Sequence, residues 1–184
     1  RRTRSMKLET DRLTLRRFRP EDTDAMVAIN ADPVVMECFP AAMSRDQTLA
    51  HLERVEAHWA KNNFGLFAVE VRETGQMIGF TGLSIPPYET PASPCVEVGW
   101  RFTPTAWRKG YATESATACL NWGFNDLDLS EIVSFTFEGN TRSIRVMERL
   151  GMTHNTADDF DHVMLPDDSP LLRHVLFRLA RPNT

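Results

Sequence analysis

A strand-to-helix turn that contains a glycine constrains this chain more than any other segment does. The turn at residues 107–114 reads Trp-Arg-Lys-Gly-Tyr-Ala-Thr-Glu, and it joins a strand-like run at 96–102 to a helix-like run at 111–124. Backbone N–H groups converge in such a turn, and a helix presents roughly half a positive charge at its N-terminus. Gly110 has no side chain that would block a close approach. The segment therefore predicts a small anion site that suits a pyrophosphate, with a plain strand–helix junction as the alternative.

Apolar periodicity predicts the other elements and one domain of mixed α and β structure. Strands are expected at 13–18, 64–72, 76–85, 95–102, 132–137, 152–155 and 171–179, and helices at 22–31, 44–62, 111–124 and 143–150. Asp22 is the expected cap of the first helix, and Ser44 with Gln47 predicts a capping box at the start of the second. This order predicts an α/β (α+β) domain over residues 8–181, with a mixed sheet and helices on both faces. Residues 1–7 are expected to be an N-terminal segment that is disordered or not native.

Composition and charge exclude several classes of function. The net charge of −4 argues against binding to nucleic acid or to an anionic membrane, and no apolar run approaches the ~20 residues that a membrane span needs. Cys38, Cys95 and Cys119 form no Cys-x-x-Cys pair, and the five histidines show no ligand spacing, so no metal site is expected. A chain with so few cysteines is expected in the reducing cytoplasm.

A second segment makes the interpretation of the turn specific. Residues 140–152 read Asn-Thr-Arg-Ser-Ile-Arg-Val-Met-Glu-Arg-Leu-Gly-Met, which predicts a helix capped by Asn140 and ended by Gly151. The two segments together resemble the GNAT superfamily of N-acetyltransferases, with its motifs [Gln/Arg]-x-x-Gly-x-[Gly/Ala] and Asn-x-x-[Ala/Ser]…Leu-Gly-[Phe/Met]. Residues 8–16, Leu-Glu-Thr-Asp-Arg-Leu-Thr-Leu-Arg, resemble the opening Leu-x-Thr-x-Arg-Leu-x-Leu-Arg of its ribosomal-protein N-terminal acetyltransferase branch. Trp107 replaces the first Gln/Arg of the motif, as is familiar in that branch.

The resemblance covers about residues 8–180 and implies both a fold and an activity. The fold would be GNAT-like, with a mostly antiparallel sheet splayed at its centre, where the pantetheine arm of acetyl-CoA pairs with the edge at 96–102. The activity would be transfer of acetyl from acetyl-CoA to a primary amine, on a protein N-terminus or a small molecule, by direct attack in a ternary complex. A non-catalytic module that binds or senses CoA on the same fold is the alternative.

The resemblance also implies the partners and the residues that contact the cosubstrate. Acetyl-CoA and an amine acceptor would be the partners of a monomer or homodimer, without nucleic acid, membrane or metal. The expected cosubstrate contacts are Val98, Gly99, Trp100, Phe102, Arg108, Lys109, Gly110, Tyr111, Ala112, Thr113, Asn140 and Ser143.

Glu97 is the first candidate for the general base that takes a proton from the amine. It lies on the strand that would line the acetyl group, and apolar strand walls raise the pKa of a carboxyl toward neutrality. A Glu that faces solvent or a neighbouring strand is the alternative. His162, His174 and Glu138 are further candidates, because histidine titrates near pH 7 and Glu138 precedes the second motif.

Ser143 is the candidate that stabilises the leaving thiolate. Many family members have a Tyr where this chain has Met147, and methionine has no proton to donate. Ser143 lies one helical turn earlier on the same face, from which its hydroxyl could approach the sulfur. The alternative is that Ser143 only completes the Asn140 cap.

Two loops are expected to border the acceptor groove. The loop at 86–94 contains four prolines, which limit its conformations. The loop at 158–170 carries Asp158, Asp159 and Asp161, which would attract a cationic acceptor or simply be solvated.

Overall fold

The computed structural model describes residues 6–183, so most of the N-terminal segment that was expected to be disordered or not native, residues 1–5, lies outside the described residues. The strands of this part are β1 (Lys7–Glu9), β2 (Leu13–Arg16), β3 (Leu66–Val71), β4 (Met77–Ser84), β5 (Glu97–Phe102), β6 (Glu131–Phe137), β7 (Thr153–His154), β8 (Phe160–Asp161) and β9 (Arg173–Ala180). The α-helices are α1 (Thr23–Ala31), α2 (Arg45–Asn62), α3 (Tyr111–Asn125) and α4 (Thr141–Arg149). Short 3₁₀ turns are η1 (Pro20–Asp22), η2 (Pro104–Ala106) and η3 (Thr156–Asp158). Within residues 6–183, no helix has both the length and the apolar character needed to cross a bilayer.

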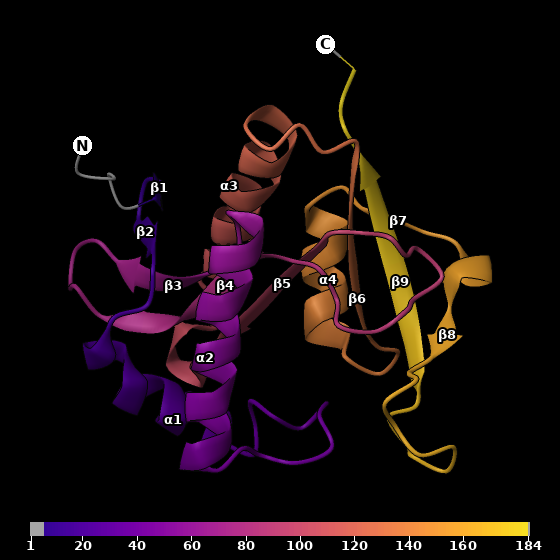
Figure 1. Ribbon diagram of the computed structural model, residues 1–184, viewed down its shortest axis with the longest axis horizontal. Coiled ribbons are helices and arrows are strands. Elements are labelled where there is room, and N and C mark those ends of the chain that lie inside the picture. The colour runs from indigo at the N-terminus through magenta and orange to yellow at the C-terminus, as the bar shows by residue number, and fades with distance from the viewer. Residues whose placement is uncertain (1–5, 184) are drawn as a thin grey trace.

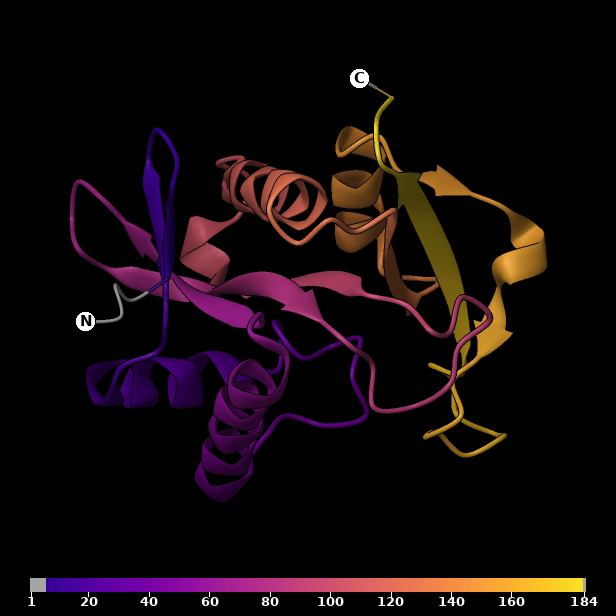
Figure 2. The ribbon, with the colours of Figure 1, turned by 45° about the horizontal axis from the view of Figure 1, so that its top comes forward.

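One sheet runs through the molecule in the order β1-β2-β3-β4-β5-β6-β9-β7, with β8 paired to β9 (Figure 1). The β5–β6 pair is parallel, and the other described pairs are antiparallel. Helices α1 and α2 lie on one face, and α3 and α4 lie on the other (Figure 2). The predicted single domain with a mixed, mostly antiparallel sheet and helices on both faces is therefore confirmed.

The sheet splays at its centre, between β5 and β6. These strands share a single Cα pair, Glu97 with Val133, where the Val133 N–H donates to the Val96 carbonyl at 2.9 Å. The Ser134 hydroxyl then donates to the Val98 carbonyl at 2.9 Å, so a side chain takes the place of the next backbone bond. Beyond this point the two strands run at a wide angle to one another (Figure 1).

Apolar side chains from both layers of helices hold the sheet in place. Leu15, Phe67 and Val98 of the sheet are completely buried in one core cluster, together with Cys119 and Leu120 of α3. A second cluster packs α1 against the opposite face of β3 and β4. Burial of this kind supplies the main driving force for folding.

Capping residues begin and end the helices where the sequence indicates. The Ser44 hydroxyl accepts from the Gln47 N–H at 3.2 Å, and the Gln47 side chain accepts from the Ser44 N–H at 2.8 Å. Asn140 accepts from the Ser143 N–H at 3.4 Å at the start of α4. Gly151 follows this helix with φ of +80°, a conformation that favours glycine. The predicted caps of α2 and α4 are therefore confirmed.

Three local predictions were wrong. Asp22 does not cap α1 with its side chain, because its carboxylate binds the Arg16 guanidinium at 2.8 and 3.0 Å and the Arg19 N–H at 2.8 Å. Strand β1 was not expected, and β8 forms inside the expected loop at 158–170. Both strands are only two or three residues long, and so short a run carries no readable period.

Candidate active site

The turn before α3 has the geometry of an anion site. Gly110 has φ of +79° and Arg108 φ of +62°, and this irregular backbone turns the chain into the helix. The Glu114 N–H makes the first bond of the helix, to the Gly110 carbonyl at 3.0 Å. Among the residues that the structure describes, no acceptor lies within bonding distance of the N–H groups of residues 108–113. These groups are therefore free to bind an anion at the helix N-terminus.

An ion pair between distant segments holds this turn in place. Arg12, in the connection between β1 and β2, donates from Nε to Glu114 Oε1 at 2.7 Å, and its guanidinium lies 4.5 Å from the centre of the Tyr111 ring. Desolvation raises the pKa of Glu114, but bonds from Thr10 and Arg12 outweigh this effect and hold the pKa below its ordinary value. A Cβ on Gly110 would lie 3.4 Å from Arg12 Nη2, so Arg12 adds a positive charge directly beside the turn. The sequence of the turn at 107–114 did not indicate that Arg12 would lie there.

The side of β5 that faces the splay leaves backbone groups free. The Phe102 carbonyl accepts from Trp107 Nε1 at 3.0 Å, and the Val98 carbonyl accepts from Ser134, so both point away from β4. Because backbone direction alternates along a strand, the N–H and C=O of Trp100 face the same way. The Gly99 carbonyl instead accepts from Thr81 of β4 at 2.8 Å. Trp100 thus offers both a donor and an acceptor at the edge where the resemblance implied pairing with pantetheine.

Glu97 lies where β5 and β6 begin to separate. Its side chain is half-buried, and in the described part of the chain no group forms a hydrogen bond or ion pair with it. Desolvation raises the pKa of Glu97 to about 8. A Cβ on Gly99, the next residue on the same face, would meet only Glu97 Oε1, at 4.0 Å, so the space before the carboxyl is open. A carboxyl with these properties can accept a proton once it is ionised, as the pH approaches 8.

The two expected loops meet beside this carboxyl. Tyr88 of the proline-rich loop lies 4.5 Å from the ring centre of His162, which is 4.8 Å from that of His174. Burial raises the pKa of Tyr88, and the nearby Glu97 carboxylate raises it further. Burial lowers the pKa of both histidines, so both rings are neutral at pH 7. The candidate bases Glu97 and His162 therefore lie near one tyrosine that the sequence did not single out, and His174 lies beside His162.

Ser143 lies in the first turn of α4, oriented by Asn140. The Asn140 amide donates to Ser143 Oγ at 3.2 Å and to Thr136 Oγ1 at 2.9 Å. Since Ser143 Oγ accepts this bond, its own proton remains available for donation. Met147 is only 1% exposed and packs in the core. The structure thus shows the expected cap and leaves the Ser143 hydroxyl free for a second role.

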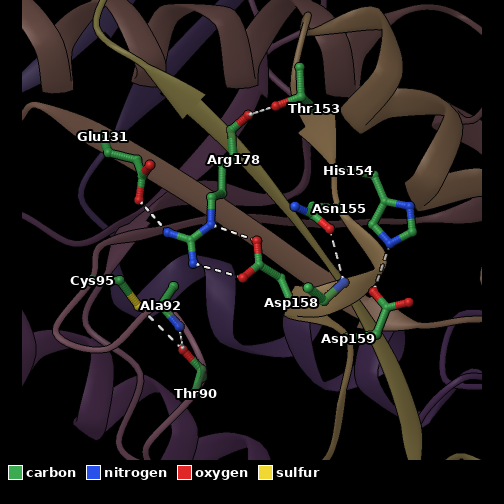
Figure 3. A network of polar contacts seen from close by, with 11 residues as sticks. Thr90, Ala92, Cys95, Glu131, Thr153, His154, Asn155, Asp158, Asp159 and Arg178 are labelled. Atoms are coloured by element: carbon green, nitrogen blue, oxygen red, sulfur yellow. Dashed lines mark hydrogen bonds and ion pairs between the residues drawn. The ribbon is translucent and has the colours of Figure 1, made fainter.

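The acidic loop carries less free charge than its sequence suggests. Asp158 accepts from Nε and Nη2 of Arg178 at 2.8 and 3.1 Å, and Asp159 lies 2.7 Å from His154 Nε2 (Figure 3). Asp161 lies 3.4 Å from Arg173. All three aspartates therefore have partners inside the chain, which weakens their attraction for a cationic acceptor.

The comparisons with known proteins agree with this geometry. The model of the acetyltransferase (GNAT) domain matches residues 12–153. The uncharacterized N-acetyltransferase YnaD of Bacillus subtilis is 32% identical over 150 residues, which cover 80% of this chain and 82% of YnaD. A GNAT-family acetyltransferase from Bacillus anthracis has a TM-score of 0.78 at 25% identity, covering 96% of this chain and 99% of that one.

A fourth likeness concerns the fold alone. Spermidine N-acetyltransferase from Vibrio cholerae, solved with CoA and spermine, has a TM-score of 0.72 at 18% identity, covering 94% of this chain and 97% of that one. The family model spans well over half of the sequence and includes the turn, β5, β6 and α4. The chain belongs to the GNAT family of acetyltransferases.

Proposed function

We propose that this protein is an acetyl-CoA-dependent N-acetyltransferase that acts on a primary amine by direct attack in a ternary complex. The observation that carries the proposal is Glu97, a half-buried carboxyl without a partner whose pKa is raised to about 8 at the splay of the sheet. The acceptor is a protein N-terminus or a small-molecule amine, and the opening pattern at 8–16 supports the ribosomal-protein branch of the family. The domain at 8–181 would act in the cytoplasm as a monomer or homodimer.

The free backbone groups fit acetyl-CoA in two places. The N–H groups of residues 108–113 and the N-terminus of α3 would bind the pyrophosphate, with the exposed side chains of Arg108 and Lys109 near it. The Trp100 backbone would pair with the amides of the pantetheine arm, in the manner of an added strand. Gly99, with its bare Cα, would leave room for the acetyl group.

Glu97 would accept the proton of the amine as the new C–N bond forms. When bound, acetyl-CoA supplies the acetyl group as a thioester, and the C–S bond breaks as the amine is acylated. Desolvation keeps Glu97 mostly protonated below pH 8, and it becomes an effective base as the pH rises through its pKa of about 8. Tyr88, His162 and His174 would line the acceptor side of this carboxyl.

Ser143 would donate a hydrogen bond to the departing thiolate sulfur. Asn140 holds Ser143 Oγ as an acceptor, which directs the hydroxyl proton elsewhere. A hydroxyl is a weak acid, so its contribution is a hydrogen bond to the sulfur rather than full protonation. The buried Met147 cannot take this role.

Thioester turnover tests the proposal against a CoA-binding module. Release of CoA thiol from acetyl-CoA is measured with a panel of peptides, amino acids, polyamines and alkylamines. The proposed function requires release that depends on an amine and that falls in Glu97→Gln. Tight CoA binding without turnover on any amine would leave the non-catalytic module, which the absence of a proton donor at Met147 favours.

A further inference from the structure

Arg101 lies on the same face of β5 as Glu97 and Gly99, because side chains alternate along a strand. Its Nη1 donates to Asn30 Oδ1 at 2.9 Å, and Asn30 in turn donates to Thr48 Oγ1 at 3.2 Å. The aromatic rings of Phe39 and Phe80 lie 4.5 and 5.2 Å from the guanidinium carbon. Contacts from α1, from the loop between α1 and α2 and from β4 thus hold the side chain in place.

The guanidinium has no counter-ion. Among the described residues, no carboxylate pairs with Arg101, and its Nε is a buried donor without an acceptor. Burial alone lowers the pKa of Arg101, to about 10, so the group stays charged at pH 7. A buried charge without a partner destabilises a fold, and proteins keep such groups where function needs them.

Two other arginines that are at least partly buried show what the guanidinium of a buried arginine binds in this chain. Arg178 uses Nε and Nη2 to hold both oxygens of Asp158 (Figure 3). Arg16 is likewise surrounded by Asp22 and Glu70. In Arg101, Nη1 is engaged by Asn30, while the Nε–Nη2 edge that fits a carboxylate has no acceptor among residues 6–183.

A second polar atom without a partner lies close by. The Nε2 atom of His51 is buried and has no bonding partner among the described groups, and its ring centre is 5.7 Å from that of Phe80. Burial lowers the pKa of His51 to about 4, and the charges of Arg101 and Arg54 contribute, so the ring is neutral. Arg101 and His51 thus present two unsatisfied polar atoms near the ring of Phe80.

An open hollow of about 430 Å³ adjoins this cluster. It is lined by residues 40–43 and by Gln47, Ala50 and Arg54 of α2, a set that contains no acidic side chain. Met43 belongs to both places, since its sulfur lies 3.9 Å from Arg101 Nη1. The charge of this region is positive, which disfavours a polycationic acceptor.

The spacing along β5 relates this cluster to the chemistry. The Glu97 carboxyl reaches to within 4.0 Å of the position of a Cβ on Gly99. Gly99 and Arg101 are two residues apart, which is about 7 Å along a strand. An amine held near Gly99 would therefore lie on the same face of β5 as Arg101, one side-chain position away.

We propose that Arg101 binds a carboxylate of the acceptor, so that the substrate is a primary amine that carries a carboxylate several bonds away. The Nε–Nη2 edge would hold both carboxylate oxygens, and His51 Nε2 would donate to one of them. This inference rests on the proposed function and names the substrate class of its acceptor site. The carboxylate would belong to a free ω-amino acid or to the acidic side chain of a peptide.

Matched acceptors test the inference. We expect the wild-type kcat/KM to be at least 10-fold higher for 4-aminobutanoate than for n-butylamine, or for the C-terminally amidated dipeptide Ala-Asp than for amidated Ala-Asn. The dipeptides are amidated because a free C-terminus would itself supply a carboxylate. The pair with the larger ratio identifies the source of the carboxylate. Arg101→Gln should lower that ratio at least 10-fold. The control is Arg45→Gln, which removes an exposed cation at the start of α2 that pairs with Asp24 of α1, and it should leave the ratio unchanged. A wild-type preference for spermidine or for the neutral partners, or an equal loss on both partners in Arg101→Gln, overturns the inference.

Binding measurements separate this inference from the proposed function. Calorimetry with 4-aminobutanoate and with C-terminally amidated Ala-Asp is carried out on the CoA-saturated protein. Binding to wild type that is lost in Arg101→Gln supports the inference even if no amine is acetylated, and absence of binding of both probes to wild type overturns it. Because Arg101→Gln removes an unpaired charge, we expect an equal or higher Tm. Should that variant fail to fold, Arg101→Lys, which keeps the charge but not the two-donor edge, must lose at least 10-fold in affinity for the inference to stand.

Discussion

Oε1 of Glu97 lies 4.0 Å from the point at which a side chain on Gly99 would begin. Gly99 is the next residue on this face of β5, and apart from residues 98 and 100 no other atom of the described part of the chain lies within 4 Å of that point. The bare Cα therefore leaves a space bounded by the carboxyl, of the kind in which an amine and a thioester can meet.

Replacing Glu97 with Gln should remove the rise of rate with pH. The wild-type rate should rise as Glu97 loses its proton near pH 8, and the rate of Glu97→Gln should stay low and nearly flat over the same range. The measurement is kcat/KM for the acceptor from pH 6 to 10. A profile that matches the wild type would move the role of base to His162 or His174.

The same variant should change stability with the opposite pH dependence. The folded-state pKa of Glu97 lies above its ordinary value of 4.5, so folding favours the protonated form, and this stabilisation is lost as pH rises toward 8. Glu97→Gln should therefore have a higher Tm than wild type at pH 9 and a similar Tm at pH 5. Thermal unfolding at the two pH values checks the sign, and a lower Tm for the variant at pH 9 would contradict the burial of an unpaired charge.

Charge at the turn before α3 should weaken CoA binding. Gly110 has a positive φ, so any side chain there strains the backbone, and the informative comparison is Gly110→Glu against Gly110→Gln. The carboxylate should lower CoA affinity at least several-fold more than the amide does, because a misplaced like charge beside a pyrophosphate costs on the order of 1 kcal/mol. Calorimetry with CoA on the two folded variants decides the matter. Equal affinities would place the pyrophosphate elsewhere.

Loss of the Ser143 hydroxyl should affect turnover more than binding. A bond to a developing thiolate is stronger in the transition state, so Ser143→Ala should lower kcat roughly 10-fold or more while the KM for acetyl-CoA changes little. The Asn140 side chain caps α4 through the Ser143 backbone, which the substitution keeps. An unchanged kcat would reduce Ser143 to its structural contact with Asn140.

Asp158 should matter for stability and not for acceptor selection. Arg178 holds the pKa of Asp158 below its ordinary value, so the stabilisation is present at neutral pH and is lost as pH falls toward the folded-state pKa. Both side chains are partly exposed, so Asp158→Asn should lower the free energy of unfolding by only about 1 kcal/mol at pH 7. Asp161→Asn, whose contact with Arg173 is longer and more exposed, serves as the matched control and should be nearly neutral. A salt-dependent rise of the acceptor KM in Asp158→Asn would restore the acidic loop as a substrate-selecting element.

Local sequence patterns were sufficient to predict most of the strands and all four helices of this fold. Period-two and helical patterns indicated seven of the strands and the four helices, and cap residues such as Ser44 and Asn140 set helix starts within a residue or two. The glycine turn was readable because positive φ at Gly110 is a local property of the backbone. Glu97 could be named as a candidate because the family resemblance puts its strand beside the acetyl group and its neighbours Val96 and Val98 are apolar.

The remaining features depend on tertiary contacts, which no local sequence pattern predicts. Arg101 meets Asn30 and Met43 from 71 and 58 positions away, and its lack of a counter-ion is visible only once these neighbours are placed. Tyr88 and His162 come from two irregular loops that carry no period. Arg12 lies 102 positions from Glu114, so its place beside the anion turn could not be read from the motif. The pairing of the acidic loop with Arg178 and His154 likewise depends on the three-dimensional fold.

The single Cα pair between Glu97 and Val133 gives the sheet an unusual mechanical character. Strands β1–β5 form one half of the sheet and β6, β9, β7 and β8 form the other, and the two halves are paired only over a short stretch. An extended group such as the pantetheine arm of CoA, inserted between the two halves, would hydrogen-bond to the Trp100 backbone and limit their relative motion. In hydrogen-exchange terms, the Trp100 amide should exchange quickly in the free protein and slowly once CoA is bound, while the amides of β5 that face β4 remain protected throughout.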